Sequence, residues 1–318
     1  MKTAQATLFL TLAILSAACS SSQKREETIS LSGAFAIYPL VVKWSEEYKK
    51  VEPDVRFNIS AGGAGKGMAD ALSETVDLGM FSREVAQAEA DKGAWWISVT
   101  KDAVIPTLNA GNPVVQTLLI RGITREEFQG LYLEKRYTNW NQLPGISINQ
   151  PINVFTRSDA CGAADTWAAY LGGKQENLKG IGVFGDPGLA DAVVKDVKGI
   201  GYNNTIYLYD IKTGKKNPGI EVIPIDVNGN GKIDEEEAFY NTFEEVLTAI
   251  ADGKYPSPPA RELYLVSKGK PKKQAVLHFL KWVMTDGQKY IPEAGYVPLK
   301  PERINQELEK LKELKGSL

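Results

Sequence analysis

The chain has 318 residues, of which 43% are hydrophobic and 24% charged, which is enough apolar material for two domains of about 150 residues each. Its formal net charge of −2 excludes a strong positive field over the whole molecule, so we expect no nucleic-acid partner and no general attraction to an anionic membrane. The single histidine, His278, excludes metal sites made of several histidines and limits histidine-based catalysis.

The first 19 residues have the pattern of a lipoprotein signal. Lys2 provides a positive charge, an apolar run extends from Leu8 to Leu15, and small residues precede Cys19. This order predicts that residues 1–18 are removed and that the Cys19 sulfur carries diacylglycerol. A plain secretory signal or a short membrane helix is the alternative, although the apolar run is short for a helix that spans a bilayer. We therefore expect a membrane-anchored lipoprotein in the periplasm or at the cell surface, with residues 19–27 as a polar tether.

Short apolar runs alternate with helix-like segments from Thr28 onward. Their β-α-β-α-β order predicts a parallel sheet covered by helices on both faces. The predicted elements are a strand over 28–34, a helix over 37–53, a strand over 55–60, a glycine turn and helix over 62–76, and a buried strand over 77–82.

The rest of the chain repeats the strand, turn and helix order and then returns. A strand over 102–108 is expected to leave the first lobe through a crossover at 109–113, and a proline-rich turn with a strand over 255–269 is the expected return. Thr124 and Glu127 form a capping-box pattern at a helix start. We predict two α/β lobes, the first made of residues 28–108 and 260–318 and the second of residues 109–259.

Three turns rich in small residues each join a predicted strand to a predicted helix; they are residues 32–34, 60–65 and 157–163. Such turns present unpaired backbone N–H groups at the positive end of a helix, and small residues let an anion approach them. In open α/β sheets, ligands bind beyond the carboxyl ends of the strands, where these turns lie. A single glycine turn most often only reverses the chain, but three of them, one with an arginine, favour an anion-binding site.

Arg157 and Arg83 are the candidate cations. A guanidinium donates two parallel hydrogen bonds to a tetrahedral oxyanion. Arg157 directly precedes the third turn, so we expect it to bind the ligand, with a structural ion pair as the alternative. Arg83 follows the predicted strand over 77–82 and faces either the same cleft or solvent. Asp159 is expected to hold Arg157 in place, or else to accept a proton from the ligand.

These segments resemble the phosphate-binding periplasmic proteins of ABC importers, in the type II solute-binding superfamily. The resemblance covers nearly the whole chain after the signal and rests on LSGAFAIYPLVVKW, SAGGAGKGMADAL with VDLGMFSRE, FTRSDACGAADTW, KGIGYNN, and YPSPPARELYLVSKG with FLKWVMTDGQKYI. It implies two Rossmann-like lobes joined by a two-strand hinge. Carried over residue by residue, it implies that the ligand is bound by Ala36 and Ile37 (backbone), Ala64, Ser82, Arg157, Cys161, Gly162 and Ala163; Gly63, Arg83 and Asp159 complete the predicted set.

The resemblance also implies a function without catalysis. The expected protein is a monomeric receptor that captures inorganic phosphate and delivers it to an ABC permease in the membrane. The sequence departs from the family pattern, because Cys161 and Ala163 replace a serine and a threonine, and Ser82 stands where some members have a proton-accepting aspartate. That aspartate distinguishes phosphate from sulfate in the family, so sulfate, molybdate or an organic phosphate are alternative ligands here.

Residues 226–237 match the calcium-loop pattern D-x-[DN]-x-[DN]-G-x₅-E at every defined position. The pattern predicts a structural calcium ion bound by Asp226, Asn228, Asn230, Lys232 (carbonyl), Asp234 (through water) and Glu237. An acidic hairpin turn is the alternative. The segment before the loop is strand-like and no second copy follows, so we expect an EF-hand-like loop fixed to a helix over 239–250 and not a calcium sensor.

Two other functions compete with the receptor. An enzyme with Cys161 as nucleophile would also hold a phosphate group at a helix N-terminus, but Arg157 precedes the cysteine and His278 is distant in the sequence. A calcium-dependent surface adhesion module fits the lipid anchor and the calcium loop. It does not explain the three anion turns or the two crossovers.

Overall fold

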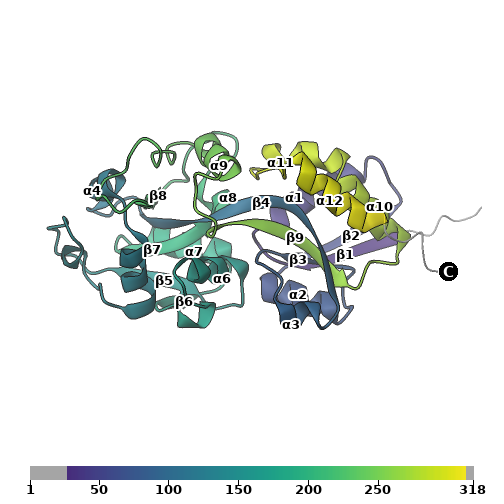
Figure 1. The fold of residues 1–318 in the computed structure, drawn as a ribbon, viewed down its shortest axis with the longest axis horizontal. Helices are drawn as coiled ribbons and strands as arrows, with labels where there is room; N and C mark the ends of the chain where they lie inside the picture. The colour runs from purple at the N-terminus through teal and green to yellow at the C-terminus, as the bar shows by residue number, and fades with distance from the viewer. Residues whose placement is uncertain (1–26, 313–318) are drawn as a thin grey trace, which may run out of the picture.

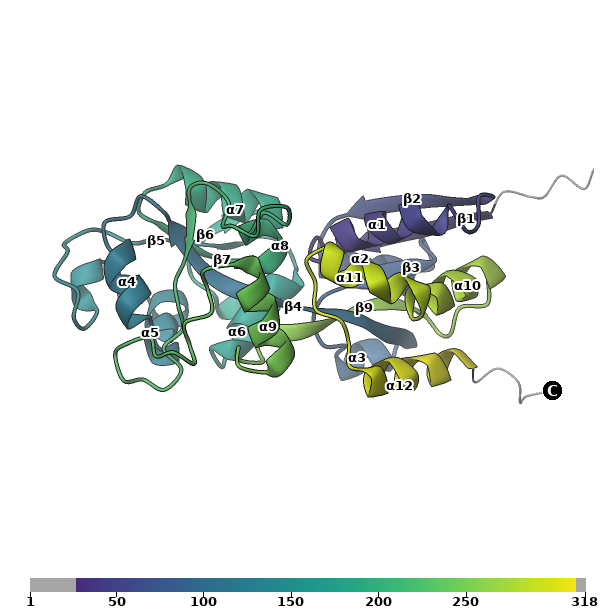
Figure 2. The same cartoon turned by 90° about the horizontal axis from the view of Figure 1, so that it is seen from above.

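The computed structural model describes residues 27–312 and shows two lobes side by side, joined by two strands (Figures 1 and 2). One nine-stranded mixed sheet runs through both lobes in the order β2-β1-β3-β9-β4-β7-β5-β6, and β8 pairs with β4 beside this path. Cys19 and the predicted signal lie outside the described residues. Between residues 27 and 312, no helix combines the length and apolarity needed to span a bilayer.

The first lobe contains the parallel strands β1, β2 and β3 and the helices that cover them. Helix α1 packs on the core through an apolar face whose side chains recur at helical spacing. In this face, Leu40, Val41 and Trp44 are completely buried. The elements are β1 (Glu27–Gly33), α1 (Tyr38–Tyr48), β2 (Val55–Ala61), α2 (Ala64–Leu72), β3 (Leu78–Phe81), α3 (Gln87–Ala90), α10 (Gln274–Val283), α11 (Tyr290–Glu293) and α12 (Pro301–Lys312).

The second lobe repeats this arrangement with β5 parallel to both β6 and β7. Its α5 begins with the predicted capping box, since Thr124 Oγ1 accepts from the Glu127 N–H and the Glu127 carboxylate accepts from the Thr124 N–H. The elements are α4 (Val115–Arg121), α5 (Arg125–Gln129), β5 (Asn153–Arg157), α6 (Gly162–Tyr170), β6 (Ile181–Val183), α7 (Asp186–Lys195), β7 (Gly199–Asn204), α8 (Thr205–Leu208), β8 (Ile220–Val222) and α9 (Phe243–Asp252).

Two antiparallel strands connect the lobes: β4 (Ala94–Asn109) and β9 (Ala260–Lys268). Strand β4 has 16 residues, so it spans about 50 Å at the usual rise per residue and reaches through both lobes. Apolar side chains up to Val99 pack in one buried cluster and those from Ala103 onward pack in another. The chain therefore passes between the lobes within β4, earlier than the crossover predicted at residues 109–113.

The fold class predicted from the sequence is confirmed, with two α/β lobes and a two-strand hinge. Element boundaries differ in places. The strand predicted over 102–108 is the second half of β4, because strand pairing with β9 begins at Ala94. The helix predicted over 239–250 begins only at Phe243, because Thr242 caps it by accepting from the Glu245 N–H.

Candidate anion-binding site between the lobes

The two lobes touch at the predicted anion turns. The Gly65 N–H, at the start of α2, donates across the cleft to the Ala160 carbonyl oxygen at 3.1 Å. A Cβ atom on Gly63 would lie 2.9 Å from that same oxygen. A Cβ atom on Gly162 would lie 2.1 Å from the Ser82 carbonyl oxygen, which is closer than real Cβ contacts allow. The glycines of both lobes thus permit a closed contact that any side chain would prevent.

Arg157, the last residue of β5, is buried at this contact and pairs with two carboxylates. Its Nε and one terminal nitrogen donate to the two oxygens of Asp159 at 2.8 and 2.6 Å, and its other terminal nitrogen donates to Asp186 Oδ1 at 2.5 Å. Two of the five guanidinium N–H donors remain for another partner. The guanidinium carbon lies 5.9 Å from the centre of the Phe35 ring, which belongs to the first lobe.

Burial and charge set the protonation of this group. Burial disfavours the charged guanidinium, but the Asp186 and Asp159 carboxylates outweigh it and raise the pKa of Arg157. Burial raises the pKa of Asp186, against the attraction of Arg157 and Arg261. Asp159 and Asp102 raise it further by repulsion. The neutral form of Asp186 is therefore favoured compared with an exposed aspartate.

In the first turn, Phe35 and not its neighbours faces the second lobe. The Ala36 and Ile37 side chains, 2% and 0% exposed, pack in the core of the first lobe, so only their backbone can reach a ligand. Phe35 contacts Phe184 edge to face, with ring centres 6.0 Å apart, and its carbonyl oxygen accepts from the Tyr207 hydroxyl at 3.1 Å. Phe35 was not predicted as a site residue, although its place in a turn that faces the cleft could have indicated it.

The N-terminus of α6 contributes Cys161, Gly162 and Ala163. Cys161 caps the helix, since its Sγ accepts from the Ala164 N–H at 3.4 Å. Burial raises the pKa of Cys161 to about 12, against the attraction of Arg157. The thiol therefore stays protonated at neutral pH and is poorly suited to act as a nucleophile, while the Gly162 and Ala163 N–H groups lie at the positive end of the helix.

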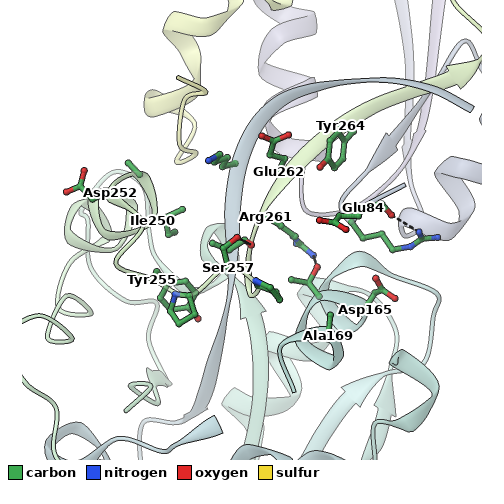
Figure 3. A pocket seen from close by; sticks show the side chains of 18 of the residues that line it. Glu84, Asp165, Ala169, Ile250, Asp252, Tyr255, Ser257, Arg261, Glu262 and Tyr264 are labelled. Carbon is green, nitrogen blue, oxygen red and sulfur yellow. Dashed lines mark hydrogen bonds between the residues drawn. The ribbon is translucent and has the colours of Figure 1, made fainter. Parts of the chain in front are cut away.

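The structure does not bring Arg83 together with Arg157. Arg83 donates from both terminal nitrogens to Glu89, at 2.7 and 3.0 Å, and its guanidinium lies 4.6 Å from the centre of the Phe81 ring. It lines a separate cavity of about 710 Å³ beside the hinge, together with Asp165 of α6 (Figure 3). Within the described residues, that cavity is lined by none of the three anion turns.

A buried arginine of the hinge connects this cavity to the anion turns. Arg261 of β9 pairs with Asp102, its ladder partner on β4, through bonds of 2.8 and 3.1 Å. It also donates to Thr166 Oγ1 on α6 at 3.2 Å and to Asn204 Oδ1 at 2.6 Å, and Figure 3 shows it extending from the strand toward α6. The helix that carries the third turn is thus tied directly to the hinge.

Asp186 was also not predicted as a site residue, although the sequence around it has the pattern of the other turns. Gly185-Asp186-Pro187 is a fourth strand-to-helix junction, with Gly185 at φ 77° and a proline in the first turn of α7. The Gly185 N–H donates to Asp159 Oδ1 at 3.1 Å, which brings the α7 N-terminus to Arg157. Because Asp186 occupies that N-terminus, its carboxyl is directed at the guanidinium.

The calcium-loop residues are close together on the second lobe. Asp226 and Glu237 are only 2% and 6% exposed, and neither forms an ion pair with a cation among residues 27–312. Their carboxylates instead accept from backbone N–H groups of the loop, and Gly231 has the left-handed φ of 80° that a sharp turn needs. Residues 27–312 hold no group of three or more His, Cys, Asp or Glu side chains already arranged around a metal position.

Relatives with known names align with most of the chain. The phosphate-binding protein PstS of Xylella fastidiosa is 26% identical over 90% of this chain and 85% of its own length. PstS of Bacillus subtilis is 24% identical over 91% and 87%. None of these names describes an enzyme, in agreement with the prediction that the chain has no catalytic role.

Solved structures share the fold. A putative phosphate ABC transporter substrate-binding protein from Clostridium perfringens, with bound phosphate, superposes with a TM-score of 0.70 at 21% identity, covering 86% of this chain and all of its own. A phosphate transport receptor from Vibrio cholerae gives a TM-score of 0.63 at 18% identity, covering 85% of this chain and all of its own. The family model for the PBP superfamily domain matches residues 18–287. The chain therefore belongs to the PBP superfamily.

Proposed function

We propose that the protein is the extracytoplasmic receptor of an ABC importer and captures inorganic phosphate between its lobes. The observation that carries this proposal is the meeting of the α2 and α6 N-termini with the buried guanidinium of Arg157 where the lobes close. Helix N-termini and guanidinium groups are the typical partners of tetrahedral oxyanions. The aligned relatives are named phosphate-binding proteins, which supports the same ligand.

In this mechanism the ligand is held mainly by the backbone. The N–H groups of Gly162 and Ala163 and of the α2 N-terminus would donate to phosphate oxygens, and Arg157 would donate its two remaining N–H groups. Backbone donors compensate for the hydroxyl groups absent at positions 161 and 163. Closing of the lobes excludes water from these bonds and gives the permease a closed form to recognise.

We propose that Asp186 is the group that distinguishes a ligand that carries a proton from one that does not. Through its contact with Arg157, the Asp186 carboxyl group would lie beside the bound anion. Its raised pKa would let it bind or release a proton more readily near neutral pH than an exposed aspartate. An ionised Asp186 would accept a hydrogen bond from the P–O–H group of monohydrogen phosphate, whereas sulfate has no such group and would be repelled. Asp186 would thus supply the carboxylate acceptor that some family members have at the position of Ser82.

Calorimetric titration of the anion-free protein with phosphate tests this function. We expect one phosphate per chain, with sulfate a weak competitor. Sulfate, molybdate or a phosphate ester that binds more tightly than phosphate would contradict the choice of ligand but not the receptor class. Absence of binding for all of these anions would contradict the receptor itself.

For the location of the receptor, we propose a diacylglycerol anchor on Cys19, a monomeric state and a membrane permease as partner. The signal pattern of residues 1–19 supports the anchor. Mass spectrometry of the N-terminal peptide from membranes should show the added lipid in the wild-type protein, and the lipid should be absent from the Cys19→Ser variant. An unmodified cysteine in the wild-type protein would contradict the anchor.

We also propose a structural calcium ion in the loop over residues 226–237. Asp226 and Glu237 are buried and have no ion-pair partner among residues 27–312, which supports this proposal in addition to the sequence pattern. Calcium should raise the melting temperature of the wild-type protein and leave that of Asp226→Asn/Glu237→Gln unchanged. Equal shifts in both proteins, or none in the wild type, would contradict the site.

A further inference from the structure

A second basic site lies in the first lobe, at the end that faces away from the second lobe. A cavity of about 320 Å³ there is bounded by β1, by the segment that follows α2, and by the loop from β9 to α10. Figures 1 and 2 show the start of β1 and α10 at this same end of the molecule. The charged side chains that line the cavity are Lys268, Lys270, Lys272, Lys273, Glu74 and Asp77. Positive charge is therefore in excess.

The two carboxylates of the cavity are already engaged by two of its lysines. Lys268 Nζ lies 3.4 Å from Glu74, and Lys273 Nζ lies 3.3 Å from Asp77. Lys272 is exposed at the rim. Lys270 differs from all three, because its Nζ is shielded from solvent and has no hydrogen-bond partner among residues 27–312. A buried ammonium group without a partner is unfavourable, so the position favours an anion.

The helix that follows adds to the positive potential. Lys273 is the N-cap of α10 and makes no side-chain cap bond. A lysine is unfavourable at a helix N-terminus, where the exposed N–H groups and the helix dipole attract negative charge. The same concentration of positive groups favours a bound phosphate group, which would accept from Lys270 and the helix start together.

We propose that this cavity binds the phosphate of an anionic phospholipid headgroup. Lys273 Nζ donates to the Thr28 carbonyl oxygen, so the cavity adjoins the beginning of β1. The nine residues from Cys19 to Thr28 span at most about 30 Å, so the cavity is within reach of a membrane that holds Cys19. The choice of a lipid source rests on the proposed anchor; the choice of a phosphate group does not. Docking here would orient the first lobe on the bilayer.

Vesicle flotation tests the headgroup site without the anchor. The full chain with Cys19→Ser is mixed with vesicles of phosphatidylcholine, alone or with phosphatidylglycerol. Binding should require phosphatidylglycerol, and Lys270→Gln and Lys272→Gln should each weaken it by about fivefold. The control is Lys212→Gln/Lys215→Gln, which removes two exposed lysines from the second lobe and should have little effect. The apolar segment before Cys19 is the same in every variant.

Three results would overturn the proposal. Vesicle binding that is unchanged in the Lys270→Gln variant would exclude the cavity, and equal losses in the control would show unspecific attraction of lysines. A second phosphate-binding event in calorimetry that Lys270→Gln removes, with vesicle binding unchanged, would replace the lipid by free phosphate. None of these results depends on the site at Arg157, so failure here leaves the receptor function separately testable.

Discussion

Arg157 and Lys270 are both shielded cations, but their charges are balanced in different ways. Arg157 lies between the lobes and is engaged by Asp159 and Asp186, whereas Lys270 lies at the outer end of the first lobe with no partner among the described residues. The first cation is part of the structure even without ligand. The second makes no hydrogen bond within the part of the chain that the structure describes. Loss of the first should therefore damage both stability and binding, and loss of the second only binding.

Replacement of Arg157 should have the largest effect on stability. Arg157→Ala leaves the buried Asp186 and the partly buried Asp159 without this cation, and breaking a buried ion pair typically costs about 3–5 kcal/mol. Urea unfolding of the anion-free protein should show this loss, and phosphate binding should fall at least tenfold. An unchanged free energy of unfolding would contradict the balanced-charge description of Arg157, and unchanged binding would show that the anion binds elsewhere.

Closure of the cleft is tested next, with Gly162→Ala. The added Cβ would lie 2.1 Å from the Ser82 carbonyl oxygen, so the lobes could not close as they do here. We expect phosphate affinity to fall by about two orders of magnitude, and small-angle scattering to show an open form with phosphate present. The control is Gly188→Ala in α7, whose Cβ would meet no backbone atom and only one side-chain atom, Val183 Cγ1, at 3.3 Å. Similar affinities for both variants would contradict the closed contact.

A smaller effect is expected for Asp186→Asn. The amide can donate to either anion, so the preference for phosphate over sulfate should fall about tenfold, as measured by competition calorimetry. Because the pKa of Asp186 is raised in the folded state, its protonated form stabilises the fold, and this contribution is lost as pH rises through that pKa. Asp186→Asn should remove that pH dependence. A wild-type preference retained by the variant would exclude Asp186 as the group that distinguishes phosphate from sulfate.

Lys270→Met should have the smallest effect on stability. It removes an ammonium group that is shielded from solvent and has no hydrogen-bond partner within residues 27–312, so the free energy of unfolding should stay the same or rise by up to about 1 kcal/mol. The measurement is urea unfolding in the same buffer as for Arg157→Ala. A loss comparable to that of the arginine variant would show that Lys270 has a structural partner, and the contrast between the two cations would disappear.

The fold was accessible from the sequence because its units are local. Each strand, small-residue turn and helix is marked by its own residues, as Thr124 and Glu127 show for one helix start. The crossover between the lobes was predicted at residues 109–113, but it lies earlier in the chain, within β4. No turn signal marks it, because β4 continues as one strand across both cores. A strand shared by two lobes has no local mark at the boundary.

The candidate site was only partly accessible. The glycine turns and Arg157 were visible, because backbone anion sites need small residues at helix starts. Partners that meet through tertiary structure were not visible: Asp186 reaches Arg157 from 29 positions away, and Arg261 joins Asp102 and Thr166 across the hinge. Arg83 was a candidate by its position after β3, yet Glu89 holds it away from Arg157.

The most direct test of the central claim is a crystal structure of the protein grown with phosphate. The account predicts one tetrahedral anion between the lobes, within hydrogen-bond distance of the Gly162 and Ala163 N–H groups and of Arg157, with the Asp186 carboxyl against one anion oxygen. A structure in which Asp186 and Asp159 alone surround Arg157, and phosphate is absent or bound in another cavity, would contradict it.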